Sequence, residues 1–149
     1  MLKIGDRMPD FEVVDQDGNK VSSNDLIGKK TVVYFYPKDN TSGCTAEACS
    51  IRDSYEALLA SGYNIVGVSK DSAASHKKFI EKYSLPFTLL SDTSTQMLQA
   101  FGAWGEKKMY GKTVLGTIRR TFIFDKDGIL ERIIEKVDTK NHADQILNP

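Results

Sequence analysis

Hydrophobic positions along the chain fall into two kinds of pattern. The runs Thr31–Tyr36 and Asn64–Ser69 consist mainly of β-branched, aromatic and small apolar residues, which is typical of strands buried on both faces. Between them, Ser50–Ala60 carries apolar side chains at the three- and four-residue spacing of an amphipathic helix. This order predicts neighbouring strands joined by a right-handed crossover.

The other elements follow from turn signals and shorter patterns. Asp17–Gly18 and Asp127–Gly128 each separate two short strand-like segments, which predicts one β-hairpin near each end of the chain. The stretch Gly102–Gly116 is punctuated by glycines, and we assign no strand or helix to it. The further predicted strands are Phe11–Asp15, Lys20–Ser22, Phe87–Leu90, Arg120–Phe124 and Ile129–Glu135, and the further helices are Ser72–Tyr83, Thr93–Phe101 and Thr139–Leu147.

These elements predict one α/β domain over residues 1–149, with a central mixed β-sheet flanked by helices and an N-terminal β-hairpin. The length suits one domain, and no linker or internal repeat divides the chain. In sheets of this kind, functional groups gather beyond the carboxyl ends of the strands. We therefore expect the chemistry in the segment that follows Tyr36.

Charge and composition narrow the function classes. The 20 basic and 20 acidic side chains cancel, and no basic block suggests binding to nucleic acid or to an anionic membrane. The N-terminus lacks the apolar core of a signal peptide, and the longest apolar runs are only as long as strands. We therefore expect a cytoplasmic protein, in which two cysteines are catalytic or free rather than a permanent structural link.

Cys44 is the first candidate for chemistry. Turn-forming residues fill Pro37–Gly43, and a helix is predicted to start near Cys44. A cysteine in the first turn of a helix faces unpaired backbone N–H groups and the positive end of the helix dipole, and both favour the nucleophilic thiolate. The alternative is that Cys44 is a small buried hydrophobic residue without a chemical role.

Thr41 and Cys49 lie on either side of Cys44 in the sequence. The Thr41 hydroxyl could turn toward the sulfur, or it could cap the helix. Five residues along a regular helix correspond to about 7.5 Å of rise and about 140° of rotation, so the two Cα atoms would lie roughly 8–9 Å apart. A disulfide usually needs less than about 7 Å. Either Cys44 and Cys49 never pair, or the start of the helix unwinds.

Other cysteine chemistries fit the sequence less well. A zinc site could be assembled from Cys44, Cys49, His76 and His142, but both histidines fall in polar helical segments where we expect solvated side chains. A cysteine protease or acyl transferase would need one of these histidines as its base, and neither has supporting local features. There is no C-x-x-C pair and no glycine-rich phosphate loop. We expect no metal and no cofactor.

The pattern Pro37-x-x-x-Thr41-x-x-Cys44 resembles the active-site signature of the peroxiredoxins. With Glu47 and Cys49 it is similar to the bacterioferritin comigratory protein (PrxQ) subfamily. One departure is Ser42, where many relatives carry proline. The likeness covers essentially the whole chain in the same order, through Asp10–Phe11, Tyr34–Pro37, Leu89–Asp92, Phe101–Lys107, Gly116-x-x-Arg119 and Phe122–Asp125.

The resemblance implies a thioredoxin-like fold and a monomeric thiol-dependent peroxidase that serves antioxidant defence. It implies hydrogen peroxide and organic hydroperoxides as substrates, and thioredoxin or a similar dithiol protein as the reductant. It also assigns a role to each motif residue. Cys44 is the peroxidatic cysteine, Cys49 the resolving cysteine, Pro37 the shield of the sulfur, Thr41 a hydrogen-bonding partner of the peroxide, Arg119 the positive charge beside the sulfur, and Glu47 the carboxylate that orients Arg119.

Arg119 rather than Arg120 matches the family position, because it lies three residues before Phe122. If both arginines lie on a strand, their side chains point to opposite faces, and we expect Arg120 to be a solvated edge-strand charge. Two alternatives to the peroxidase remain. One is a redox sensor or relay that passes oxidation from Cys44 to a partner protein, and the other is a non-enzymatic thioredoxin-fold binding domain.

Overall fold

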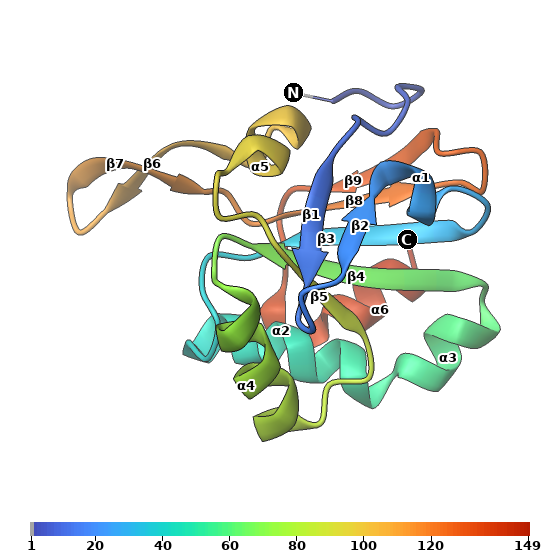
Figure 1. Ribbon diagram of the computed structural model, residues 1–149, viewed down its shortest axis with the longest axis horizontal. Coiled ribbons are helices and arrows are strands. Elements are labelled where there is room, and N and C mark those ends of the chain that lie inside the picture. Colours follow the sequence, from blue (N-terminus) through green and yellow to red (C-terminus); the bar gives the residue numbers. More distant parts are fainter. Residues whose placement is uncertain (1) are drawn as a thin grey trace.

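The computed structural model describes residues 2–149 as one seven-stranded sheet with helices on both faces and a separate two-stranded hairpin (Figure 1). None of the helices in residues 2–149 has the length and apolar character needed to cross a membrane. The strands are β1 (Glu12–Asp15), β2 (Lys20–Ser22), β3 (Lys30–Phe35), β4 (Tyr63–Ser69), β5 (Thr88–Ser91), β6 (Trp104–Met109), β7 (Lys112–Thr117), β8 (Arg120–Phe124) and β9 (Leu130–Ile134). The helices are α1 (Ser23–Leu26), α2 (Ser42–Asp53), α3 (Tyr55–Ala60), α4 (Ala73–Tyr83), α5 (Gln96–Phe101) and α6 (His142–Leu147), the last preceded by a 3₁₀ turn (Thr139–Asn141).

The main sheet has the strand order β2-β1-β5-β4-β3-β8-β9. Strand β3 pairs parallel with β4 and antiparallel with β8, so the sheet is mixed, as the sequence predicts. The N-terminal hairpin of β1 and β2 joins the same sheet because β1 pairs antiparallel with β5. The predicted C-terminal hairpin is also present as β8 and β9.

The buried strand β3 separates two layers of core. Because successive side chains of a strand point to opposite faces, Val32 and Tyr34 pack with α2, α3, α4 and α6, whereas Val33 and Phe35 pack with α1 and α5. All four side chains are at most 1% exposed. The prediction of a central strand buried on both faces is confirmed. The segment that follows β3 leads into α2, on the face of the sheet that α2, α3, α4 and α6 cover.

The predicted helix Ser50–Ala60 is in fact the end of α2 followed by α3. The two helices are separated at Ser54, where φ is −113° and ψ is 17°. The apolar stripe continues across the break, since Ile51 and Leu58 both enter the same core. Hydrophobic spacing therefore predicted the burial of Ile51 and Leu58, but the neighbouring Leu59 of the same stripe is 49% exposed. It also could not detect a break of one residue.

The stretch from Gly102 to Gly116, to which the sequence analysis assigned no element, contains the hairpin of β6 and β7. Its turn residues Tyr110 and Gly111 have φ of 53° and 78°, the left-handed values that a tight hairpin turn requires. The hairpin projects from the body of the molecule (Figure 1). Because Met109 of β6 is 47% exposed and Leu115 of β7 is 64% exposed, the strands bury no continuous apolar face and lack the alternation that would predict them.

Candidate active site

Cys44 lies in the first turn of α2, just beyond the carboxyl end of β3. Helix α2 begins at Ser42, and its N-cap residue Thr41 has an extended backbone. The Cys44 side chain is only 1% exposed and belongs to the core beneath α2. The predicted helix start near Cys44 is confirmed, so the sulfur lies where the backbone N–H groups of a helix have no partners within the helix.

Arg119 reaches Cys44 from the segment just before β8. Its Nη2 donates a hydrogen bond to Cys44 Sγ at 3.3 Å, and its Nη1 donates to Glu47 Oε1 at 2.6 Å. Glu47 lies one turn after Cys44 on α2, so a single guanidinium bridges two side chains of the same helix. We call Cys44, Glu47 and Arg119 the Cys44 cluster.

The charges of this cluster are strongly coupled. Burial acts to lower the pKa of Arg119, but Glu47 and Cys44 outweigh it and raise that pKa above its usual value. Arg119 is therefore a fixed cation beside the sulfur. Burial raises the pKa of Glu47 from 4.5 to about 7, although Arg119 acts to lower it. The carboxyl group of Glu47 consequently titrates close to neutral pH.

His142 adds a residue behind Glu47 that the sequence analysis did not assign to the site. Its Nε2 lies 3.4 Å from Glu47 Oε2 and 2.7 Å from Thr121 Oγ1. Glu47 Oε2 is buried and forms no hydrogen bond within residues 2–149. Burial, the largest cause, lowers the pKa of His142. The Tyr34 hydroxyl is also buried without a hydrogen-bond partner among the described residues.

The expectation that His76 and His142 are solvated is wrong, because both are 0% exposed. Both were expected in solvent from the polar character of their helices, yet His76 contacts Asp39 and the Leu90 carbonyl oxygen, and His142 contacts Thr121 and Gln145. A signal was present for His76, since Phe79 lies three residues later and faces the same core. No comparable local signal marks His142, which is buried because the C-terminal helix packs against α2.

Thr41 and Pro37 border the Cys44 loop. The Thr41 hydroxyl donates to the carbonyl oxygen of Lys38 at 2.9 Å and forms no capping bond to α2. Thr41 is exposed, and its oxygen retains free acceptor capacity toward solvent. Pro37 is partly buried and directly follows Tyr36 at the end of the strand.

Cys49 lies on the same uninterrupted helix as Cys44. Both thiols are free, and Cys49 is partly exposed whereas Cys44 is buried. Because α2 is continuous from Ser42 to Asp53, the five-residue offset keeps the two sulfurs too far apart for a disulfide. Pairing would need the first turns of α2 to unwind.

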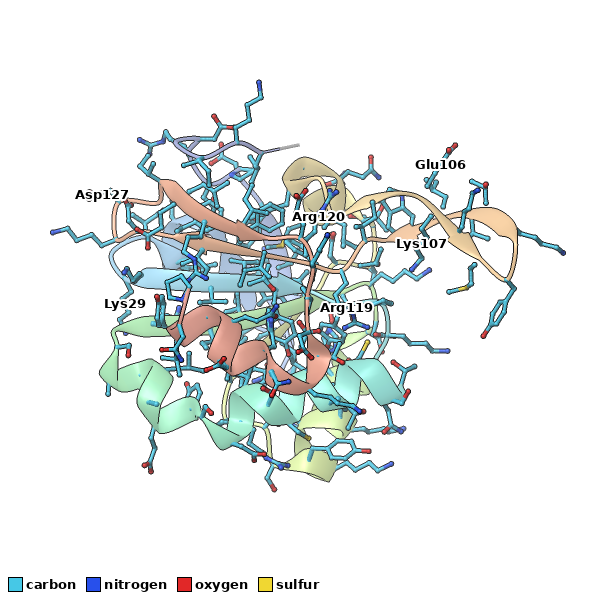
Figure 2. All side chains as sticks on the ribbon, turned by 180° about the vertical axis from the view of Figure 1, so that it is seen from behind. Lys29, Glu106, Lys107, Arg119, Arg120 and Asp127 are labelled. Atoms are coloured by element: carbon cyan, nitrogen blue, oxygen red, sulfur yellow. The ribbon has the colours of Figure 1, made fainter. Side chains whose placement is uncertain are left out.

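Arg120 is positioned differently from the expectation of a solvated edge-strand charge. Strand β8 lies between β3 and β9, so it is not an edge strand. The Arg120 guanidinium donates to the carbonyl oxygen of Gly102 and lies 3.6 Å from Glu135. Figure 2 shows Arg119 and Arg120 directed to opposite sides of the sheet, Arg119 toward α2 and α6 and Arg120 toward α5.

The chain was compared with known proteins. Residues 4–133 match the AhpC/TSA family. The peroxiredoxin Bcp of Escherichia coli (strain K12) is 44% identical over 147 residues, which cover 99% of this chain and 94% of that protein. The peroxiredoxin Bcp of Bacillus subtilis (strain 168) is 44% identical over 146 residues, covering 98% and 93%.

Solved structures are similar to this chain over most of its length. The bacterioferritin comigratory protein of Xanthomonas campestris superimposes with a TM-score of 0.86 at 36% identity, covering 92% of this chain and 87% of that one. A mutant of PrxQ from Xylella fastidiosa superimposes with a TM-score of 0.92 at 29% identity, covering 99% and 94%.

The family match and the thioredoxin-like fold of its solved relatives identify the class of this protein as a thiol-dependent peroxidase. The chain belongs to the AhpC/TSA family and resembles its Bcp/PrxQ peroxiredoxins over nearly its whole length. The predictions of fold class, family and enzyme class are confirmed. A peroxide substrate and a thiol reductant follow from the family.

Proposed function

We propose that Cys44 is the peroxidatic cysteine of this enzyme and Cys49 its resolving cysteine. The observation that carries the proposal is the 3.3 Å hydrogen bond from Arg119 Nη2 to Cys44 Sγ in the first turn of α2. A helix N-terminus and a guanidinium together stabilise the thiolate, which is the nucleophilic form of cysteine. Cys49 is the only other cysteine of the chain.

In the first step the Cys44 thiolate attacks one oxygen of the hydroperoxide and breaks the O–O bond. The attacked oxygen stays on sulfur as a sulfenic acid, and the other leaves as an alkoxide or hydroxide that takes up a proton from solvent. The Arg119 guanidinium stabilises the negative charge that develops on the leaving oxygen. The Thr41 oxygen accepts a hydrogen bond from the incoming hydroperoxide, Pro37 shields the sulfur, and Glu47 holds the guanidinium in place.

In the second step the Cys49 thiolate attacks the Cys44 sulfenic acid. A disulfide forms, and the oxygen leaves as water after taking up a proton. Because α2 holds the two sulfurs apart, this step requires the first turns of the helix to unwind. A dithiol protein then returns two electrons and two protons by exchange, and α2 re-forms.

Several finer features belong to the same proposal. We assign hydrogen peroxide and organic hydroperoxides as substrates, since the Xanthomonas campestris relative has alkyl peroxide reduction activity. We assign thioredoxin or a similar dithiol protein as the reductant. The enzyme acts as a monomer of one domain, because both cysteines lie on one helix and need no second subunit. Its thiols are free, which suits the reducing cytoplasm.

The direct test adds one equivalent of hydrogen peroxide to the reduced protein, followed by a thiol alkylator. Intact mass and free-thiol count are then measured for wild type and for Cys49→Ser. We expect wild type to lose both thiols and two mass units within seconds. We expect Cys49→Ser to gain one oxygen.

If both thiols of wild type survive, Cys44 is not peroxidatic. If Cys49→Ser forms a disulfide-linked dimer as fast as wild type forms its internal disulfide, Cys49 is not needed for resolution. Slow loss of both thiols together with a stable mixed disulfide to an added partner protein would instead favour a redox relay.

A further inference from the structure

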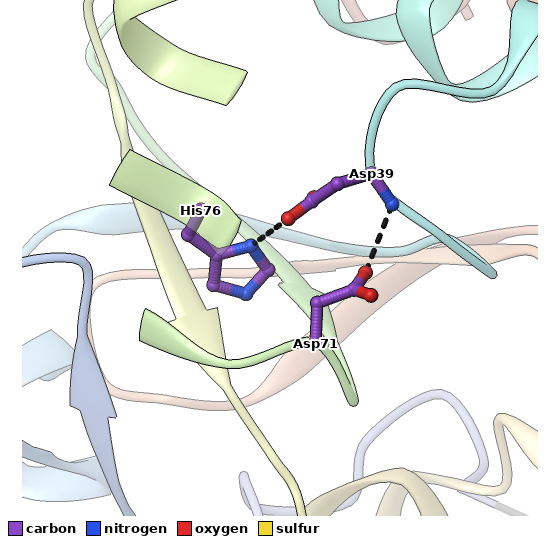
Figure 3. Close-up of side chains that lie close together, drawn as sticks. All are labelled: Asp39, Asp71 and His76. Atoms are coloured by element: carbon purple, nitrogen blue, oxygen red, sulfur yellow. Dashed lines mark hydrogen bonds and ion pairs between the residues drawn. The ribbon is translucent and has the colours of Figure 1, made fainter. Parts of the chain in front are cut away.

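A second buried charged pair lies on the α4 side of the Cys44 loop. His76 Nδ1 lies 2.7 Å from Asp39 Oδ2 (Figure 3). His76 Nε2 lies 3.0 Å from the carbonyl oxygen of Leu90. His76 is 0% exposed and Asp39 is 8% exposed. The Asp39 carboxylate also accepts from the Tyr36 hydroxyl at 2.6 Å and from the Ser75 hydroxyl at 2.7 Å. We call Asp39 and His76 the loop anchor.

The hydrogen-bond partners define the charge of this pair. The Leu90 carbonyl oxygen only accepts hydrogen bonds, and the Asp39 carboxylate also only accepts while it is ionised, so both ring nitrogens of His76 donate to them. The Tyr36 hydroxyl, 3.4 Å from His76 Nδ1, donates its own proton to Asp39 at 2.6 Å. Burial acts to raise the pKa of Asp39, but the hydrogen bonds from His76 and Tyr36 outweigh it and hold that pKa below its usual value. The loop anchor is therefore a buried ion pair.

Its geometry does not suit a metal ion. Asp39, Asp71 and His76 are the group within residues 2–149 whose side-chain atoms come close enough to hold one. Asp71 Oδ2, however, already accepts from the Asp39 backbone N–H at 2.9 Å (Figure 3). It also accepts from the Ser69 hydroxyl at 2.7 Å. A metal would displace the proton of an imidazolium that has complete hydrogen bonding. The cluster is a closed network of protein contacts.

The position of the loop anchor in the sequence links it to catalysis. Asp39 lies between Pro37 and Thr41, which border the sulfur. The next residue, Asn40, is also tied to α4, because its side-chain oxygen accepts from the Tyr83 hydroxyl at 3.1 Å and from Lys82 Nζ at 3.3 Å. Asn40 has a left-handed backbone, with φ of 60°. Two successive loop residues are thus fixed to one helix just before α2 begins.

We propose that Asp39 and His76 are positioning residues for peroxide reduction: their ion pair holds Pro37–Thr41 in the reactive arrangement, and it stays closed while α2 unwinds to form the disulfide. This inference rests on the proposed role of Cys44. A buried ion pair with complete hydrogen bonding is costly to break, whereas the first turn of a helix is the part that frays most readily. The moving segment therefore begins at Thr41.

The test separates the two chemical steps. Asp39→Asn, His76→Asn and the double variant are mixed in reduced form with hydrogen peroxide, and sulfenic acid formation and disulfide formation are timed by rapid quench and intact mass. We expect each variant to slow the first step about tenfold, because Pro37 and Thr41 lose their fixed geometry. We expect disulfide formation to stay within about twofold of wild type, and the double variant to match the single ones because the pair acts as one unit.

Thr31→Val is the matched control. Thr31 is buried at the opposite end of β3, and its hydroxyl bonds the carbonyl oxygens of Leu26 and Lys29. Its removal costs a buried hydrogen bond without touching the loop, so both steps should keep wild-type rates. Should Thr31→Val slow the first step as much as Asp39→Asn does, the effect would be general destabilisation and the inference would fail.

A measurement on wild type covers the case in which the variants do not fold. Nitrogen-15 NMR of the His76 ring should show both ring nitrogens protonated in the reduced and in the disulfide form. Loss of either N–H signal in the disulfide form would mean that the anchor opens, which contradicts the inference. A parallel speeding of disulfide formation in the anchor variants would contradict it in the same way. If wild type forms neither sulfenic acid nor disulfide with hydrogen peroxide, the proposed function fails first.

Discussion

The loop that precedes Cys44 lies between two buried charged groups, which differ in how completely their polar atoms are hydrogen-bonded. On one side, the Cys44 cluster brings Arg119 onto the sulfur and leaves Glu47 Oε2 without a hydrogen bond among the described residues. On the other side, the loop anchor does not contact the sulfur. Each of its charged atoms has a hydrogen-bond partner.

This difference matches the difference in task. Under the proposed function Arg119 stabilises a thiolate and then a leaving oxygen, and Glu47, which holds Arg119, keeps one carboxyl oxygen without a hydrogen bond among the described residues. A buried charged pair whose task is to fix a loop stabilises that loop most when every donor and acceptor of the pair forms a hydrogen bond. The Arg119 side of the loop therefore differs in two ways: Glu47 Oε2 lacks a hydrogen bond among the described residues, and the Glu47 pKa is raised to about 7. Perturbed groups of this kind are common at catalytic sites.

The largest expected effect comes from removing the charge on the Arg119 side of the loop. Arg119→Met should lower the second-order rate constant of Cys44 with hydrogen peroxide by about 10²–10³, the usual loss for one donor that stabilises a developing anion. Stopped-flow kinetics of the reduced protein measures this rate. Arg120→Met is the control, because it removes the neighbouring guanidinium, which points away from Cys44, and its rate should stay within about twofold of wild type. Equal losses in both variants would show that contact with the sulfur is not what matters.

Glu47→Gln tests whether burial of the Glu47 carboxyl group lowers the free energy of unfolding as the pH rises to neutrality. The folded protein favours the protonated carboxyl, since burial raises the Glu47 pKa from 4.5 to about 7. The stability from this group is complete below pH 4.5 and is lost as the pH rises through 7, by about 3 kcal/mol in total. Glutamine stays neutral, so urea unfolding of both reduced proteins should show the variant gaining on wild type between pH 5 and pH 8. Parallel pH profiles would mean that Glu47 is ionised throughout this range.

Ser42→Pro should have the smallest effect, and it acts on the segment between the two charged groups. Ser42 is the first residue of α2, where proline is well tolerated, and the preceding residue Thr41 has φ of −97° and ψ of 158°, as proline requires. We expect a gain of about 0.4–1 kcal/mol in unfolding free energy. Disulfide formation should slow by up to about fivefold if this stability is lost on unwinding. Ser61→Ala, at the end of α3, is a control that should change neither quantity. Faster disulfide formation in Ser42→Pro would place the unwinding elsewhere.

The sequence alone determined the features that depend on neighbours in the chain. The runs that became β3 and β4 are recognisable because a doubly buried strand must be apolar at successive positions. The helix start near Cys44 follows from the turn-forming residues before it. The motif around Cys44 and the further family motifs along the chain indicated the family and the fold class. The position of Arg119 three residues before Phe122 identified it as the arginine to examine.

Only the tertiary structure decided which side chains meet. Arg119 and Glu47 are 72 residues apart, and His76 and Asp39 are 37 apart, so no local pattern reports their contacts. Both histidines were placed in solvent because periodicity describes one element at a time, whereas burial depends on what packs over that element. The β6–β7 hairpin was not predicted for a different reason. It buries no continuous apolar face, and its strands are held by backbone hydrogen bonds, which leave no hydrophobic pattern in the sequence.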